Sequence, residues 1–496
     1  MSTSTPTRPA APEPSSAPAV PDSPPVTDRE RFTADDRVTL TRLLRRLHFY
    51  AGILVGPFLL IAAVTGFLYA LAPSAESLLH RDLLNASSTA QTTPLSAQVS
   101  AARKSEPTLR VGGAVVGAPG RNTMVLFTDD TLGESRQRAV FVDPGTGQVE
   151  GSTVVYGSSY ALPERTWLSE MHRRLHLGEP GRIYSELAAS WLAPIALVGI
   201  SLWWRQRRTV GRARELSARG AARRTHTTVG LVMAIGFLFL SATGLTWSKH
   251  TGANIGDLRT QMHWKTPSVS TALPGAAAGT AAGMAGEHTE HQTVAGAATL
   301  DVASFDRVTA TAQRELQAPY LVTPGKQAKA WTAKETRHSW TVGPDAIAVA
   351  PTTGEVTARV DFASYPLAAK LTDWGIRLHM GFMFGLANQF VLAAIAASLA
   401  VVTVHGYRMW WLRRPTRRDS VSGSTVATAR VGRPPRRGAM RRLFRAHPVG
   451  CTLAAVAVAV IGWCVPLLGI SLTLFLIIDS AIESAAREND EGSCCS

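Results

Sequence analysis

Five long apolar stretches constrain this chain of 496 residues more than any other feature, because each is long enough to cross a lipid bilayer, which takes about 20 residues. They are residues 48–71, 186–204, 226–247, 380–411 and 449–478. Charged residues make up only 18% of the chain, whereas about 25% is typical of soluble proteins. The sequence therefore predicts a mainly α-helical protein that crosses a membrane several times, and it excludes a compact soluble enzyme.

The positive charge of the chain follows the apolar stretches in a regular way. Its 51 Lys and Arg outnumber its 36 Asp and Glu, which gives a net charge of +15. The arginines cluster before the first stretch, between the second and third, and between the fourth and fifth, at residues 42–46, 205–225 and 412–448. Because arginine-rich loops stay cytoplasmic, we expect a multi-pass protein of the cytoplasmic (inner) membrane, with its N-terminus inside and its C-terminus, after the fifth span, outside. The positive charge is then explained by the orientation of the chain in the membrane, and we expect no nucleic-acid partner.

Residues 72–185 and 248–379 are then extracytoplasmic, and both predict small α+β domains. In the first, helical spacing over residues 95–103 precedes strand-like runs at 124–128, 138–142 and 149–156. In the second, a helix over 302–316 precedes strands at 318–322, 338–342, 346–350 and 356–362. Residues 1–40, rich in Pro, Ser and Thr, predict a disordered cytoplasmic tail, and the Ala/Gly/Thr-rich residues 268–299 predict a flexible insert.

Landmarks recur in the same order in the two halves of the chain. The first apolar stretch contains His48-x3-Gly52 and Thr65-Gly66, and the third contains His226-x3-Gly230 and Thr243-Gly244 at the same offsets. Arg174-Leu175-His176 precedes the second stretch and Arg377-Leu378-His379 the fourth, and these stretches end in Trp203-Trp204 and Trp410-Trp411. Chance does not explain such coincidence. We therefore expect a four-helix core built from two repeated units, each with an outer domain, plus a fifth C-terminal span at 449–478.

Most of the repeated residues have structural explanations. The Trp pairs are typical of membrane interfaces, and the Thr-Gly pairs and the glycine four residues after each histidine are typical of close helix packing. The histidines are different, because ionisable groups at membrane depth tend to mark function. Seven lie at membrane ends: His48, His226 and His405 on the cytoplasmic side, and His172, His176, His250 and His379 on the outer side.

Facing imidazoles in an apolar helix bundle favour one kind of centre. Two axial histidines are enough to hold a haem between helices, whereas zinc and copper sites usually take three or four clustered donors. No Glu, Asp or Cys lies near His48 or His226 in their apolar stretches. The pattern therefore favours haem, with histidines at each membrane face, and it leaves open which of His48, His226 and His405 pair.

Residues 40–415 resemble the PepSY-associated transmembrane helix family, whose members include iron-regulated membrane proteins and inner-membrane ferric-siderophore reductases. The resemblance rests on the repeated landmarks and on two Pro-x-Thr-Gly turns, at residues 144–147 and 351–354. It implies a core with two b-type haems that passes electrons to an extracytoplasmic ferric chelate, such as a ferric siderophore, during iron acquisition. The implied iron ligands are His48, His226, His176 and His379, with His405, His172 and His250 as further candidates.

Partners and competing functions follow from the same residues. Arg174 and Arg377 stand near outer histidines and are candidates to bind haem propionates or to anchor the interface. No Gly-x-Gly-x-x-Gly fingerprint follows a strand, so we expect a separate cytoplasmic flavoprotein or a quinol as electron donor. The competing hypotheses are a non-enzymatic regulator that binds an extracytoplasmic peptidase, and a transporter. Against transport, the two units have the same orientation and the apolar stretches lack buried acidic residues.

Two groups of residues lie outside the resemblance. The insert contains Met284, His288 and His291, which a flexible linker explains more simply than a metal site. Of the four cysteines, two are adjacent at Cys494-Cys495, so a disulfide framework is excluded.

Overall fold

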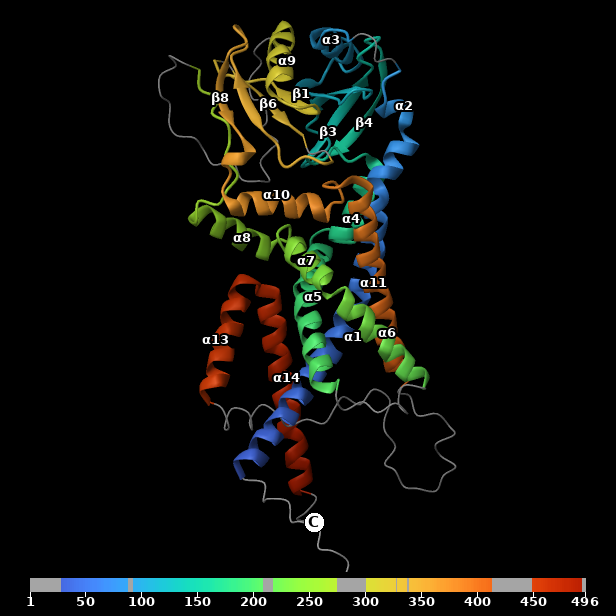
Figure 1. The fold of residues 1–496 in the computed structure, drawn as a ribbon, viewed down its shortest axis with the longest axis vertical. Helices are drawn as coiled ribbons and strands as arrows, with labels where there is room; N and C mark the ends of the chain where they lie inside the picture. Colours follow the sequence, from blue (N-terminus) through green and yellow to red (C-terminus); the bar gives the residue numbers. More distant parts are fainter. Residues whose placement is uncertain are drawn as a thin grey trace, which may run out of the picture.

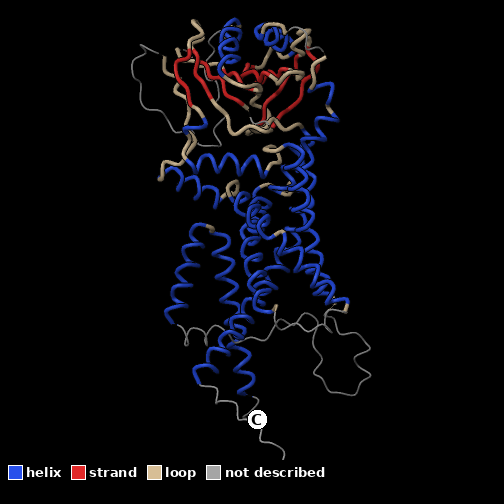
Figure 2. Tube along the Cα trace, viewed as in Figure 1, coloured by secondary structure: helices blue, strands red, loops and turns tan. Residues whose placement is uncertain are grey.

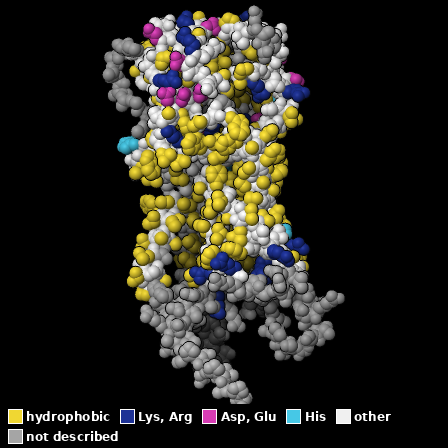
Figure 3. Space-filling view, in the orientation of Figure 1, with side chains coloured by type: hydrophobic (Ala, Val, Ile, Leu, Met, Phe, Trp, Pro, Cys, Tyr) yellow, Lys and Arg dark blue, Asp and Glu magenta, His cyan; other side chains and the backbone are white. Residues whose placement is uncertain are grey.

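The computed structural model describes residues 28–87, 92–207, 217–273, 300–326, 328–336, 339–412 and 448–492. These residues form a helical bundle and an antiparallel sheet, joined by a layer of short helices (Figure 1 and Figure 2). Hydrophobic side chains cover the bundle as a broad belt, while charged side chains gather on the sheet, and Lys and Arg at the opposite end (Figure 3). Such a belt is what a membrane-spanning protein presents to lipid.

The bundle contains the membrane spans. Three helices are each long and apolar enough to cross a membrane: α1 (Asp28–Leu79), α5 (Glu179–Gln206) and α11 (Gly385–Trp411). The helices α6 (Ala218–Val232) and α7 (Ala234–Leu245) meet the same criterion as a pair. Within the described ranges this gives three spans, or four when the bent pair counts as one, and it confirms a multi-pass membrane protein.

The third span departs from the continuous helix expected over residues 226–247. It bends by 62° between α6 and α7, at Met233. Gly230 and Gly236 stand three residues to either side of the bend, and glycine lowers the cost of leaving helical geometry. Gly236 also brings α7 close to α11, because a Cβ there would lie 2.9 Å from the Ile395 side chain.

The fifth span, expected at residues 449–478, is instead a pair of helices. The chain forms α13 (Pro448–Cys464) and α14 (Pro466–Gly492), which lie side by side as a hairpin (Figure 1). Pro466 lacks an N–H and its ring obstructs the preceding turn, which favours a break between two helices at this point. The hairpin packs on α5, where Trp191 Nε1 donates to Ser471 Oγ at 2.9 Å. The end of α14 therefore lies at the same end of the bundle as the start of α13.

A single eight-stranded antiparallel sheet takes the place of two separate outer domains. Its order is β4-β3-β2-β1-β5-β6-β7-β8. The strands are β1 (Arg110–Val116), β2 (Thr123–Thr128), β3 (Arg136–Val142), β4 (Val149–Tyr156), β5 (Tyr320–Thr323), β6 (Trp331–Glu335), β7 (Ala346–Val349) and β8 (Val356–Val360). The helices α3 (Leu95–Ser105) and α9 (Ala303–Glu315) cover one face of the sheet, over a shared hydrophobic core (Figure 1).

The two halves of the sheet meet at β1 and β5, and β1 was not expected from the sequence. Gly112 and Gly113 interrupt its apolar alternation, and glycine is uncommon in strands. The structure shows why glycine is needed: a Cβ on Gly113 would lie 2.8 Å from the Val322 carbonyl of β5. The strand expected at residues 338–342 is also wrong, because β6 occupies this place in the order and residues 339–342 form turns and bends.

A layer of helices separates the bundle from the sheet (Figure 1). It contains α4 (Pro163–Arg174), α8 (His250–Gln261) and α10 (Leu367–His379). The short helices α2 (Arg81–Leu84) and η2 (Phe362–Ser364) complete the connections. The edge strand β4 leads into α4, and the opposite edge strand β8 leads through η2 into α10. Both edges of the sheet therefore position a helix of this layer.

The hairpin makes a prediction about topology. A reporter fused after Gly492 should lie on the same side of the membrane as a reporter at the N-terminus, because α13 and α14 run in opposite directions. Green fluorescent protein and alkaline phosphatase fusions at both ends measure this directly. Truncation after Cys464 is the matched control, since the chain then ends after α13 alone and the reporter should change sides. Reporters on opposite sides in the full chain would contradict the hairpin.

Candidate functional site

Two histidines from different helices face each other in the bundle, and we call His48 of α1 and His226 of α6 the inner pair. Their ring centroids are 6.1 Å apart and their planes make an angle of 88°. Metal–imidazole bonds of about 2 Å to one nitrogen of each ring, added to ring radii of about 1 Å, require a separation of about 6 Å. The separation of the two rings therefore fits residues that would hold one metal ion between them.

Main-chain carbonyls of the neighbouring spans orient the inner pair. His48 Nδ1 lies 3.1 Å from the carbonyl oxygen of Ile195 on α5, and His226 Nδ1 lies 2.8 Å from that of Val402 on α11. Because a carbonyl oxygen only accepts, Nδ1 carries the proton in both rings and donates it. Nε2 therefore keeps its lone pair, which is the form of imidazole that binds a metal.

A glycine makes room for each ring of the inner pair. A Cβ on Gly199 would lie 3.2 Å from His48 Cε1, and one on Gly406 would lie 3.7 Å from His226 Cε1. Each glycine stands four residues after the carbonyl that accepts from its histidine. These residues were missed in the sequence, yet a signal was present, because each also stands four residues before the Trp-Trp pair that ends its span.

A second set of histidines lies in the helix layer, and we call His172 of α4 and His379 of α10 the outer pair. His172 Nδ1 lies 3.0 Å from Thr65 Oγ1, and His379 Nδ1 lies 2.7 Å from Thr243 Oγ1. Each threonine hydroxyl already donates to the carbonyl four residues earlier on its own helix, at 2.7 Å in both cases. The hydroxyl oxygen therefore accepts from Nδ1, and Nε2 is again left with its lone pair.

Burial keeps the outer pair in the neutral form. Loss of solvent lowers the pKa of His172 to about 4 and that of His379 to about 3, and His172 itself contributes to the shift of His379. Both imidazoles are therefore neutral at pH 7, as metal ligands must be. The Thr-Gly pairs, expected to serve helix packing alone, contact these rings: a Cβ on Gly66 would lie 3.2 Å from His172 Cε1.

The repeated Arg-Leu-His landmark equates His176 with His379, but His176 lies apart from both histidine pairs. His176 follows the end of α4 with a φ of 53°, and its ring lies 5.0 Å from that of Trp167. The Arg-Leu-His landmarks coincide in sequence but not in space, because α4 ends at Arg174 while α10 continues to His379. His172, one turn earlier on α4, makes the contact that corresponds to that of His379.

The two histidine layers are separated by an apolar core. Thr65 follows His48 on α1 by 17 residues, which corresponds to about 26 Å along a helix. Thr243 follows His226 by the same number of residues, across the bend between α6 and α7. Buried side chains of four helices, among them Val55, Leu59, Trp191, Phe237 and Leu399, fill this interval. His379 and His405 lie on different helices, because α10 ends at His379 and α11 begins at Gly385.

His405 belongs to neither pair by its hydrogen bonds. Its Nδ1 contacts the carbonyl of Val401 on its own helix at 2.9 Å, on the exposed side of α11. It lies within electrostatic reach of His226. His405 therefore lies near the inner pair without the carbonyl from a neighbouring helix that orients both members of the pair.

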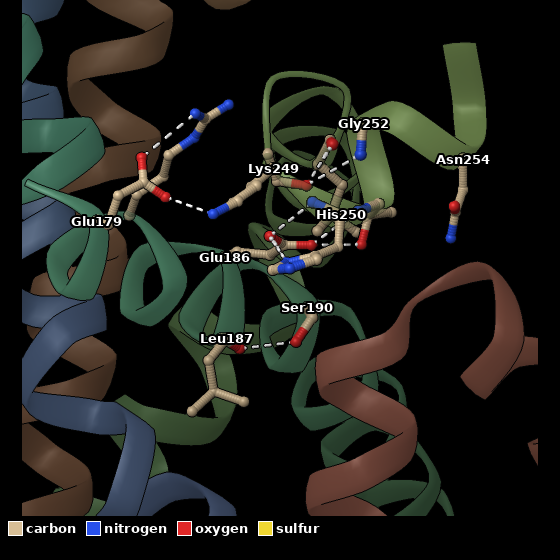
Figure 4. Close-up of polar contacts among 12 residues, drawn as sticks. Glu179, Glu186, Leu187, Ser190, Lys249, His250, Gly252 and Asn254 are labelled. Carbon is tan, nitrogen blue, oxygen red and sulfur yellow. Dashed lines mark hydrogen bonds and ion pairs between the residues drawn. The ribbon is translucent and has the colours of Figure 1, made fainter. Parts of the chain in front are cut away.

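His250 is the partner of a buried carboxylate that the sequence analysis did not expect. Glu186, at the start of the second apolar stretch, is 2% exposed, and the described spans therefore do contain a buried acid. Its carboxylate accepts from Thr251 N and Thr251 Oγ1, both at 2.8 Å, and from His250 N at 3.1 Å. Figure 4 shows Glu186 reaching from α5 to the first turn of α8, where His250 lies. A carboxylate at a helix N-terminus replaces water on free N–H groups, so this contact docks α8 on α5.

Of the expected propionate ligands, Arg377 has hydrogen-bond acceptors within the protein, whereas Arg174 has an ion pair. Arg174 lies 3.7 Å from Glu170 on its own helix. Arg377 is 1% exposed and donates to Thr341 O at 2.6 Å and to Val342 O at 3.2 Å. Arg377 therefore fixes residues 341–342 to α10. Met284, His288, His291, Cys494 and Cys495 lie outside the described residues.

The role of Glu186 as a cap for α8 is testable through stability. Glu186→Ala should lower the free energy of unfolding by about 1–3 kcal/mol, because it leaves buried N–H groups of α8 without an acceptor. Glu179→Ala removes an exposed ion pair with Lys249 (2.6 Å) on the same face of α5. It is the control and should leave the free energy of unfolding almost unchanged, because exposed ion pairs contribute little to stability. Denaturant titration of the detergent-solubilised protein measures both. Equal effects would rule out the capping role.

The chain matches one known family over the region that holds both histidine pairs. The family model of the PepSY-associated TM region matches residues 45–413, well over half of the chain. No curated protein matches the sequence. The chain therefore belongs to the PepSY-associated TM region family.

Proposed function

We propose that the chain is a membrane oxidoreductase that holds two b-type haems and carries electrons across the cytoplasmic membrane to an extracytoplasmic ferric chelate, such as a ferric siderophore. The observation that carries this proposal is the shared state of four buried or half-buried imidazoles. All four are arranged in two pairs, all four donate from Nδ1, and all four keep Nε2 for a ligand. Ferric-chelate reduction itself rests on the resemblance to reductases of this family.

The residues fit haem better than other metal groups. The inner pair supplies two ligands at the required separation, and a bis-histidine haem needs no third protein donor. His48 and His226 would hold one haem, and His172 and His379 the other. When bound, haem iron supplies reversible one-electron oxidation and reduction.

The chain itself contributes orientation, basicity and a dry interior. The Nδ1 hydrogen bonds fix the rotation of each ring and make Nε2 a better donor. The apolar core between the two histidine layers excludes water. The reduction potentials of the haems would then depend mainly on the protein groups around them and less on solvent. No acid or base of the chain is needed for the redox step.

The repeated unit takes on a functional meaning in this proposal. His48 and His172 belong to the first half of the chain, and His226 and His379 to the second. Each pair therefore takes one ligand from each half. We interpret the core as two copies of one unit, neither of which completes a haem site alone.

The direction of transfer follows from the expected topology. We place the arginine-rich loops and the N-terminus in the cytoplasm, so a separate flavoprotein or a quinol would supply electrons near the inner pair. The sheet would then lie outside the membrane, where the ferric chelate arrives. The outer pair is the layer nearest to that sheet (Figure 1).

The decisive experiment is a reduced-minus-oxidised absorbance spectrum with a pyridine haemochrome count on the purified protein. The wild type should contain two low-spin b-type haems. His172→Ala and His379→Ala should each lose one haem and keep the other, because each removes a residue that would hold the same haem. His176→Ala is the matched control on the same segment and should keep both.

Two further outcomes would contradict the proposal. A colourless protein from haem-replete cells would remove the electron-transfer role and leave the regulator of an extracytoplasmic peptidase as the function to test. Loss of haem in His176→Ala but not in His172→Ala would restore the ligand set implied by sequence alone. If haem is present, the dithionite-reduced protein should be reoxidised by a ferric chelate, and this reoxidation should be lost in His379→Ala.

A further inference from the structure

Arg165, near the start of α4, is a buried cation with an unused hydrogen-bond donor. It is 3% exposed. Its Nε lies 2.8 Å from Glu76 Oε2, and its Nη2 donates to the Ser159 carbonyl at 3.0 Å. Nη1 is also buried, and no acceptor for it exists among the residues that the structure describes. A buried guanidinium N–H without an acceptor loses its hydration and gains nothing in return, so an acceptor from outside the chain is expected here.

Arg165 lies on the helix that carries His172 and near the segment that follows His379. It precedes His172 by seven residues, which places both on one face of α4 about 10 Å apart along the helix axis. Its guanidinium lies 5.3 Å from the ring centroid of Phe382, which follows His379 by three residues. Arg165 therefore stands between the two segments that carry the outer histidines.

The charges around Arg165 favour an anion. Glu76 is held in place by a second hydrogen bond, from Leu162 N to Oε1 at 2.8 Å, at the N-terminus of α4. Arg173 lies close by, with Nη1 donating to the Tyr156 hydroxyl at 2.9 Å. Two guanidiniums thus stand near the buried carboxylate of Glu76, whereas Glu164 of the same turn is exposed and contacts His80. The N-terminus of α4 adds a partial positive charge.

We propose that Arg165 binds a propionate carboxylate of the haem held by the outer pair. The inference rests on the proposed function, since it requires a haem at His172 and His379. Guanidinium and carboxylate form strong charge-assisted hydrogen bonds, and Nη1 is the donor that remains for one. Arg377, which the sequence suggested for this role, already donates to acceptors within the protein. Arg174, also suggested, has an ion pair with Glu170 at 3.7 Å and stands at the end of α4, on the far side of His172 from Arg165.

The first test is a spectroscopic redox titration of the full-length protein. Arg165→Gln should lower the midpoint potential of one haem by about 59 mV or more, a tenfold change in a one-electron equilibrium, because the reduced haem loses a nearby positive charge. The other haem should keep its potential. Arg182→Gln, which changes a partly exposed arginine 3.8 Å from Glu179, is the control and should shift neither.

A second test separates a direct bond to the propionate from a general effect of charge. Wild type and Arg165→Gln are reconstituted with haem dimethyl ester, in which both carboxylates are blocked. If Arg165 binds a propionate, the difference in potential between the two proteins should disappear with the ester. A difference that persists with the ester would overturn the proposal, as would the absence of any shift with unmodified haem.

A third variant covers the case in which Arg165→Gln does not fold. Arg165→Lys keeps the charge beside Glu76 but changes the donor geometry, so it should give a smaller shift that the ester also removes. A wild-type protein without haem would instead overturn the proposed function, and Arg165 would then have no propionate to bind. If the protein holds two haems and neither midpoint potential changes when Arg165 is substituted, this inference alone is overturned.

Discussion

The hydrogen bond from Nδ1 of each paired histidine is the interaction on which the rest of the helical core depends. A buried imidazole must place its proton on an acceptor, and the bundle supplies one for each ring: two main-chain carbonyls and two threonine hydroxyls. The same bond selects the tautomer, fixes the ring and frees the other nitrogen. The packing of the helices leaves space for these rings, because glycines stand where a ring approaches a neighbouring helix closely, as at Gly66 and Gly199.

Local sequence could predict the spans, the helix α9 and most strands, because these depend on apolar periodicity and length. It could not predict β1, because Gly112 and Gly113 interrupt the alternation while tertiary pairing with β5 requires a glycine at 113. Pro466 indicated that residues 449–478 divide into two helices, but the length of the apolar stretch favoured a single span. The buried carboxylate of Glu186 was not predicted, because its partners on α8 are distant in sequence.

The histidine site shows the same limit at finer scale. Offsets within one helix were reliable, so His48 and His226 were found through the spacing to their Thr-Gly pairs. The outer residues depend on where α4 and α10 end, and a shift of one helical turn exchanges His176 for His172. Arg165 carried no sequence signal at all, because its orphaned Nη1 results from contacts with Glu76 and Ser159 that only the folded chain creates.

The continuous sheet has a mechanical consequence. One edge strand leads into α4 and the other leads through η2 into α10, so eight hydrogen-bonded strands connect the two helices that carry the outer histidines. The sheet therefore supports the helices that carry the outer pair, in addition to the hydrogen bonds to Thr65 and Thr243 of the spans. The inner pair has no such support and depends on helix packing alone. A change in bilayer thickness that tilts the spans should thus disturb the two layers unequally, with the inner histidines moving and the outer ones held in register.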